Sequence, residues 1–145
     1  MNWKFEAIEK LRQYEAKKKA LESIPEERAR LESVMSGIRS ATSDGSPVKG
    51  GGSGREDMML NNIVQREELD RSLEQTQKWV KVVEAALKVL DNEERMLLER
   101  LYINPVRGNL DRLCGELGIE KSSVYRRRDK ALHHFTIALY GCVEI

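Results

Sequence analysis

Residues 69–90 read LDRSLEQTQKWVKVVEAALKVL, and the apolar positions in this stretch decide the fold. They alternate spacings of four and three residues over three heptads, which is typical of a helix with a narrow apolar stripe. The positions are Leu69, Leu73, Thr76, Val80, Val83, Leu87 and Leu90. Such a stripe must be shielded from water, so it predicts a partner helix.

A first helix, predicted from Trp3 to Ser23, can provide that partner. Its apolar residues also recur at helical spacings, and they are Phe5, Ile8, Leu11, Tyr14 and Leu21. We expect this helix to fold back antiparallel, because an intramolecular partner has a high effective concentration. A homo-oligomer formed through the same region is the alternative. Pro25 predicts the end of the first helix and the start of a short second one at residues 25–38.

Residues 40–54, SATSDGSPVKGGGSG, predict a flexible link, because glycine and serine dominate and little can be buried. A long helix is expected from about Arg55 to Leu90. We therefore predict an all-α protein with an antiparallel coiled-coil helical hairpin at residues 1–90. The remaining residues, 91–145, form the predicted DNA-binding domain.

Residues 91–105 predict the first helix of that C-terminal domain. Asp91 and Glu94 stand three residues apart, as the two partners of a helix cap do. The dipeptide at 104–105, Asn-Pro, predicts the end of this helix. After a short helix in GNLDRLCGELG, either Ser122 or Ser123 is expected to cap the last helix.

The last two helices have the spacing of a helix-turn-helix. A left-handed residue is needed in the turn between them, and glycine adopts that conformation most readily. The expected positions are Leu113 and Leu117 in the core, Cys114 at the helix crossing, Gly118 in the turn, Ile119 beneath it and Val124 as the anchor of the second helix.

The basic residues of the chain concentrate in that last helix. Residues 121–130 contain five basic residues and one acidic residue, although the whole chain has a net charge of only +1. In a helix-turn-helix the start of the second helix enters the major groove, where arginine can bind guanine edges or phosphates. The predicted DNA-binding residues are Lys121, Ser122, Ser123, Tyr125, Arg126, Arg127, Arg128 and Lys130. A solvated helix face is the alternative, but adjacent arginines repel one another unless an anion is near.

Two stretches carry a resemblance to known families. LDNEERMLLERLYINP with LDRLCGELGIEKSSVYRRRDKALHHF resembles region four of bacterial sigma factors, over roughly residues 90–140. More closely, YRRRDKALHHFTIALYG is similar to the ArpU/RinA-like family of phage-encoded transcriptional regulators, found in prophages of Gram-positive bacteria. The resemblance implies a regulator that binds double-stranded DNA. RNA polymerase is a further candidate partner, and the sequence leaves open whether it is contacted. The resemblance points to Ser122, Ser123, Tyr125, Arg126 and Arg127 as recognition residues.

The sequence has few features of an enzyme, a metal or cofactor protein, or a membrane protein. Glu93, Glu94 and Glu99 have no accompanying nucleophile or phosphate-binding loop, so we expect no enzymatic activity. The two cysteines form no CxxC pair and the two histidines are adjacent, so neither a metal nor a cofactor is expected. No apolar run is long enough for a membrane span, and the charged N-terminus leads us to expect a cytoplasmic protein.

Two further functions are compatible with this pattern. One is a DNA-packaging factor similar to a phage terminase small subunit, which would form a ring-shaped oligomer. The other is an adaptor whose coiled-coil hairpin binds a protein partner while the basic helix contacts an acidic surface.

Overall fold

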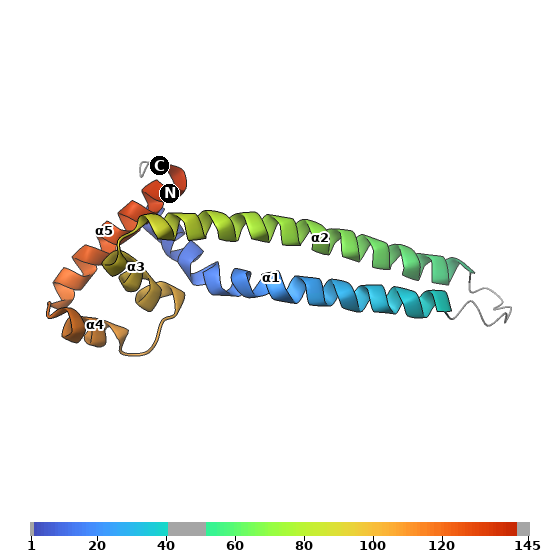
Figure 1. The fold of residues 1–145 in the computed structure, drawn as a ribbon, viewed down its shortest axis with the longest axis horizontal. Helices are drawn as coiled ribbons and strands as arrows, with labels where there is room; N and C mark the ends of the chain where they lie inside the picture. Colours follow the sequence, from blue (N-terminus) through green and yellow to red (C-terminus); the bar gives the residue numbers. More distant parts are fainter. Residues whose placement is uncertain (1, 41–51, 142–145) are drawn as a thin grey trace. The chain divides into compact units, whose positions relative to one another are not determined.

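The computed structural model describes residues 2–40 and 52–141, and all the regular secondary structure in these ranges is helical (Figure 1). The elements are α1 (Trp3–Ser40), α2 (Gly52–Val89), α3 (Asn92–Leu98), the π-helical turn η1 (Glu99–Ile103), α4 (Asn109–Leu117) and α5 (Lys121–Tyr140). The predicted all-α class is confirmed. Among the described helices, none combines the length and the apolar character that a membrane crossing requires.

Helix α1 continues through Pro25, so the predicted break at this residue is wrong. A proline inside a helix removes one backbone hydrogen bond and crowds the preceding turn. Contacts beyond the proline compensate for this loss. Leu31 and Met35 are buried, and Arg28 pairs with Asp70 on α2. Packing of the apolar face therefore outweighs the local preference of the sequence, as it does in most protein helices.

The predicted flexible link falls mostly on residues that the structure does not describe. Its first residue, Ser40, belongs to α1, and its last three, 52–54, belong to α2. Residues 41–51 lie outside the described part of the chain. Helix α2 thus begins slightly earlier than the predicted start at Arg55.

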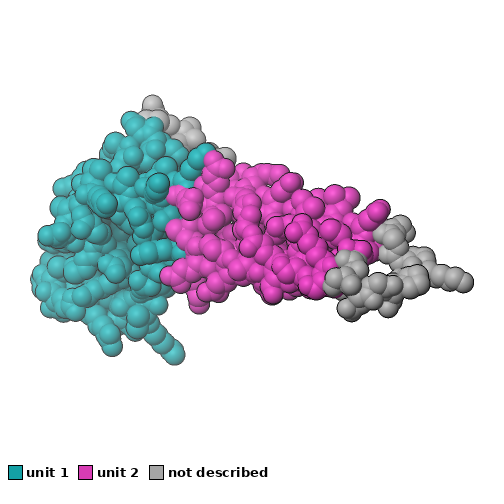
Figure 2. Space-filling model, turned by 45° about the vertical axis from the view of Figure 1, so that its right-hand side comes forward, with its two compact units in different colours: residues 1–18, 78–145 teal, residues 19–77 magenta. Residues whose placement is uncertain are grey.

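The chain divides into two compact units (Figure 2). Unit 1 takes residues 1–18 and 78–145, and unit 2 takes residues 19–77. Helices α1 and α2 each contribute to both units. The predicted domain boundary after residue 90 does not coincide with this division and stays a prediction.

In unit 1 the start of α1 packs against the end of α2. The Tyr14 hydroxyl donates a hydrogen bond of 2.8 Å to the Glu84 carboxylate, and burial together with this contact raises the pKa of Tyr14. The Lys17 ammonium lies 4.5 Å from the centre of the Trp79 ring. Apolar residues from both helices are buried here: Ala7, Leu11, Val80, Val83, Leu87 and Leu90.

In unit 2 the rest of α1 pairs with the rest of α2. Arg28 bonds Asp70 at 2.5 Å, and the Asn62 side-chain amide donates to the Leu31 carbonyl at 2.8 Å. Residue numbers rise on α1 as they fall on α2, so the pair is antiparallel. The predicted stripe positions in this unit, Leu69, Leu73 and Thr76, are half-buried. In unit 2 these stripe positions are thus less buried than Val80, Val83, Leu87 and Leu90 in unit 1.

Phe5 lies outside the core, contrary to the sequence prediction. Its side chain is 60% exposed, whereas Ala7 and Leu11 are fully buried. The buried stripe of α1 passes through Ala7, Leu11 and Tyr14 at spacings of four and three. Because successive helical residues are about 100° apart, Phe5 points roughly 200° away from Ala7.

Side chains secure the junction between α2 and α3. The Arg95 guanidinium donates to the carbonyl oxygens of Leu87 at 3.1 Å and Leu90 at 2.9 Å, which satisfies acceptors left over at a helix end. The Asp91 carboxylate accepts the Glu94 backbone N–H at 2.8 Å. This contact confirms the predicted cap of α3.

Two alanine substitutions test the burial pattern of α1. Leu11→Ala should lower the free energy of unfolding by about 2–5 kcal/mol, because it removes a fully buried side chain. Phe5→Ala should change it by no more than about 0.5 kcal/mol, since an exposed side chain is removed. Urea denaturation of both variants checks this. Equal losses would show that Phe5 is as buried as Leu11.

Candidate nucleic-acid interface

Helices α4 and α5 are joined by a turn of three residues, Gly118–Glu120. Gly118 has φ 65°, the left-handed conformation predicted for it, and the Ile119 N–H donates to the Cys114 carbonyl at 3.2 Å. Because the backbone of Glu120 is extended, α5 begins directly after it, at Lys121.

Neither serine caps α5, so that prediction is wrong. The capping position belongs to Glu120, and no side chain provides a cap hydrogen bond there. The Glu120 carbonyl already accepts the Val124 N–H at 3.1 Å, which places Ser122 and Ser123 inside the first turn. Ser123 instead accepts a hydrogen bond from the Arg126 guanidinium at 3.1 Å.

A small apolar cluster packs the start of α5 against α3 and α4. Leu97 of α3, Leu113 of α4 and Val124 of α5 are completely buried against one another. Partly buried residues pack around them: Met96, Leu101, Leu110, Cys114, Leu117 and Ile119. Every core position predicted for the last two helices and their turn is in this cluster. The cluster fixes α5 to α3 and α4, and it leaves the opposite side of α5 to solvent.

The outer side of α5 carries most of the predicted DNA-binding residues. Ser123, Arg126, Arg127 and Lys130 line one shallow depression in the surface. Lys121, Ser122 and Tyr125 are exposed as well. No acidic side chain lines this depression within the described residues. Four side chains that can donate hydrogen bonds therefore border a place that is open to solvent.

Two of these basic residues also face the acidic first turn of α3. Arg127 pairs with the Glu93 carboxylate at 2.5 Å. Lys130 lies near Asp91, and its charge contributes to lowering the pKa of Asp91 after the stronger effect of the Glu94 backbone N–H. Together with Glu94 and Leu97, these residues line a second depression. The basic row of α5 is thus partly balanced by carboxylates of α3.

Arg128 points to a different side of α5. Its side chain is only 26% exposed, and its guanidinium bonds the Asp129 carboxylate at 2.9 Å. It also lies 4.8 Å from the centre of the Tyr125 ring, at the distance of a cation–π contact. These contacts occupy Arg128 within the protein itself, which sets it apart from the other predicted DNA-binding residues.

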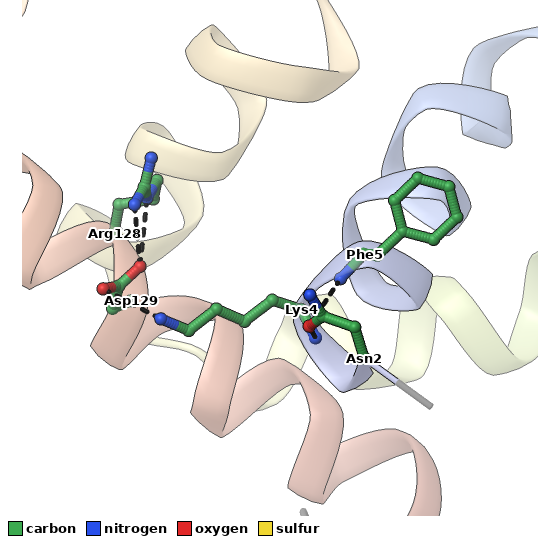
Figure 3. Close-up of polar contacts among 5 residues, drawn as sticks. All are labelled: Asn2, Lys4, Phe5, Arg128 and Asp129. Carbon is green, nitrogen blue, oxygen red and sulfur yellow. Dashed lines mark hydrogen bonds and ion pairs between the residues drawn. The ribbon is translucent and has the colours of Figure 1, made fainter.

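Asp129 links this arginine to the start of α1 (Figure 3). The Lys4 ammonium lies 3.1 Å from the Asp129 carboxylate, while Phe5 points away from it. Burial acts to raise the pKa of Asp129, but hydrogen bonds from Lys4 and Arg128 outweigh it and hold the pKa below its ordinary value. Asn2 orders the start of α1 by accepting the Lys4 backbone N–H at 3.1 Å.

The two histidines of α5 have separate surroundings. The His134 ring nitrogen lies 2.5 Å from the Glu94 carboxylate, whereas His133 meets the ring of Trp3 edge-on, with the ring centres 5.9 Å apart. Within residues 2–40 and 52–141, no three His, Cys, Asp or Glu side chains gather as a metal site would need.

Sequence reasoning missed the partners of the arginines. Glu93 is 34 residues from Arg127, and Lys4 is still farther along the chain from Asp129. The one available signal was the acidic start of α3, where the sequence analysis considered Glu93 only as a catalytic candidate. Comparisons of the chain with family models, curated proteins and solved structures find no match.

Two glycines of α4 and its turn make a matched test. Gly118→Ala should lower the free energy of unfolding by about 1–2 kcal/mol, because the left-handed backbone of Gly118 disfavours a Cβ. The space is open, since no atom lies within 4 Å of the Cβ that alanine would add. The space beside Gly115 is equally open, but Gly115 lies inside the helix. Gly115→Ala should therefore raise the free energy of unfolding by up to about 1 kcal/mol. Chemical denaturation measures both. A Gly118→Ala variant as stable as Gly115→Ala would contradict the turn conformation.

The cap of α3 predicts a dependence of stability on pH. Because the Glu94 N–H bond lowers the pKa of Asp91, the ionised cap stabilises the fold above the ordinary pKa. This contribution disappears as the pH falls through the lowered value. Asp91→Asn keeps an acceptor oxygen without the charge. We expect the stability difference between wild type and Asp91→Asn to shrink as the pH is lowered from neutral in urea denaturation; a constant difference would contradict the role of the charge.

Proposed function

We propose that the chain is a sequence-specific transcriptional regulator that binds double-stranded DNA and performs no chemistry. In this proposal α4 and α5 form a helix-turn-helix similar to sigma factor region four, and α1 and α2 form a coiled-coil hairpin. The observation that carries it is the depression lined by Ser123, Arg126, Arg127 and Lys130 on the solvent side of a firmly seated helix. The resemblance to prophage regulators is consistent with it, and so is a cytoplasmic location.

The mechanism follows from how α5 is held. Its first turn would enter the major groove, where base edges carry a readable pattern of donors and acceptors. Arg126 is the best candidate for a base contact, because it is exposed and bonds the neutral hydroxyl of Ser123. Ser122, Ser123 and Tyr125 would lie beside it. Lys121 and Lys130 would bind phosphates and fix the register of the helix.

Acidic neighbours limit how much of this charge is available to DNA. Lys121 lies 3.7 Å from Asp111, and both Arg127 and Arg128 have carboxylate partners. Each exposed ion pair is weak by itself, but the nearby carboxylates repel an approaching phosphate. We therefore expect modest affinity for arbitrary duplexes, since phosphate contacts provide most non-specific binding.

A protein-binding adaptor is the second candidate, and exposed apolar residues of α2 favour it. In unit 2, Leu60 is 59% exposed and Val64, one turn further, is 43% exposed. Neighbouring apolar side chains on a solvent face can mark an interface. Failure to bind duplex DNA at low salt, together with capture of a protein partner, would favour this function.

Selection of bound sequences from random duplex DNA tests the proposed regulator directly. We expect the full-length chain to enrich a defined site. That selected duplex and a scrambled duplex of equal composition then serve as probes. A chain that binds neither duplex at low salt is not a DNA-binding regulator.

Two substitutions separate base contacts from phosphate contacts. Arg126→Ala should cost about 1–3 kcal/mol on the selected duplex and relax the preference at one position. Lys130→Ala should weaken binding to both duplexes similarly. It should also reduce the salt slope, the change of log affinity with log salt concentration, by about one unit, because one phosphate contact is lost. Titrations at several salt concentrations measure both effects. If both variants lose equal affinity for both duplexes, α5 binds DNA through its charge alone and does not read the sequence.

A further inference from the structure

Arg127 and Lys130 each line two surface depressions, only one of which has acidic side chains among its described lining residues. One contains Ser123, Arg126 and Lys130. The other contains carboxylates of α3, among them Glu93. The Glu93 carboxylate bonds one terminal nitrogen, Nη1, of the Arg127 guanidinium, and both side chains are roughly half exposed. One end of the guanidinium is therefore held, while the side chain also reaches the acid-free depression.

The carboxylate changes which ligands the arginine accepts. A guanidinium has five N–H donors in a fixed plane, so a bond to Glu93 leaves donors for a second partner. A phosphate in that position would bring a second anion next to the carboxylate, and like charges repel. The acceptor edge of guanine is neutral, so it does not meet this repulsion, and it matches the two-donor fork of arginine.

We propose that Glu93 is a positioning residue that directs Arg127 to a guanine edge and away from phosphates. This inference rests on the proposed function, because it needs α5 to lie in the major groove. It adds Arg127 to Arg126 as a base-reading residue, and it gives α3 a part in specificity although α3 does not have to touch the DNA. The matching partner is a site with a guanine opposite Arg127.

The other arginines of α5 do not combine these features. Arg126 lines the acid-free depression but bonds a neutral hydroxyl. Arg128 has a carboxylate partner, yet it is mostly buried and stacked on Tyr125. Only Arg127, among these three residues, has both an exposed side chain and an acidic partner from another helix.

Glu93→Gln separates charge from position, because glutamine keeps an acceptor oxygen for Arg127. Full-length wild type and variant are titrated with the selected duplex and with the scrambled duplex. We expect the variant to bind the scrambled duplex about two- to fivefold more tightly, with a smaller gain on the selected one. The salt slope on the scrambled duplex should steepen by about one unit as Arg127 gains a phosphate.

Glu27→Gln is the matched control. Glu27 pairs with Arg30 in unit 2, and its side chain is 45% exposed, compared with 43% for Glu93. The control changes the net charge equally and should leave the ratio of the two affinities and the salt slope unchanged. A structural loss at Glu93 would lower the thermal midpoint and both affinities, and it would not steepen the slope.

The double variant Glu93→Gln/Arg127→Ala identifies the residue responsible. Without Arg127, the change at Glu93 should no longer alter the affinity ratio or the salt slope. If Glu93→Gln behaves like Glu27→Gln, or if its effect persists without Arg127, the positioning role is wrong while DNA binding stands. If wild type binds neither duplex, the proposed function fails and this inference fails with it.

Discussion

The apolar stripe of α2 is the constraint on which the structure depends. A long helix with one narrow apolar face gains most of its stability from the partner that covers this face. Helix α1 contacts α2 in both compact units, where Tyr14 bonds Glu84 and Arg28 bonds Asp70. In unit 1, α3 begins two residues after the stripe ends at Leu90, and Arg95 ties the end of α2 to α3. The end of α2 is thereby joined directly to α3, which packs against α4 and α5.

Most periodic and local signals were read correctly from the sequence, although the cap of α5 was expected at a serine and lies at Glu120. The stripe of α2, the Asp91 cap, the turn at Gly118 and the buried position of Val124 each depend on residues close together in the chain. The other errors concern competition between local preference and packing. Pro25 disfavours a helix, yet burial of Leu31 and Met35 beyond it holds α1 together. Phe5 is strongly apolar, but the register of α1 turns it to solvent.

The pairing of charges between helices could not be predicted either, and the reason is different. Glu93 meets Arg127 only because Leu97, one turn along α3, packs against Val124 of α5. Such a contact depends on the crossing of two helices, and side-chain spacing within one helix gives no information about it. The sequence identified the basic residues of α5 but not their acidic partners. Those partners balance part of the positive charge on α5.

The two compact units also differ in how the chain order builds them. Unit 2 is one continuous segment, whereas unit 1 joins the first 18 residues to those from Lys78 onward. During synthesis the first residues of α1 are made early, but Tyr14 has no partner on α2 until Glu84 follows. The ion-pair partner of Lys4, Asp129, is synthesised later still. The early segment must therefore remain exposed while unit 2 can already fold.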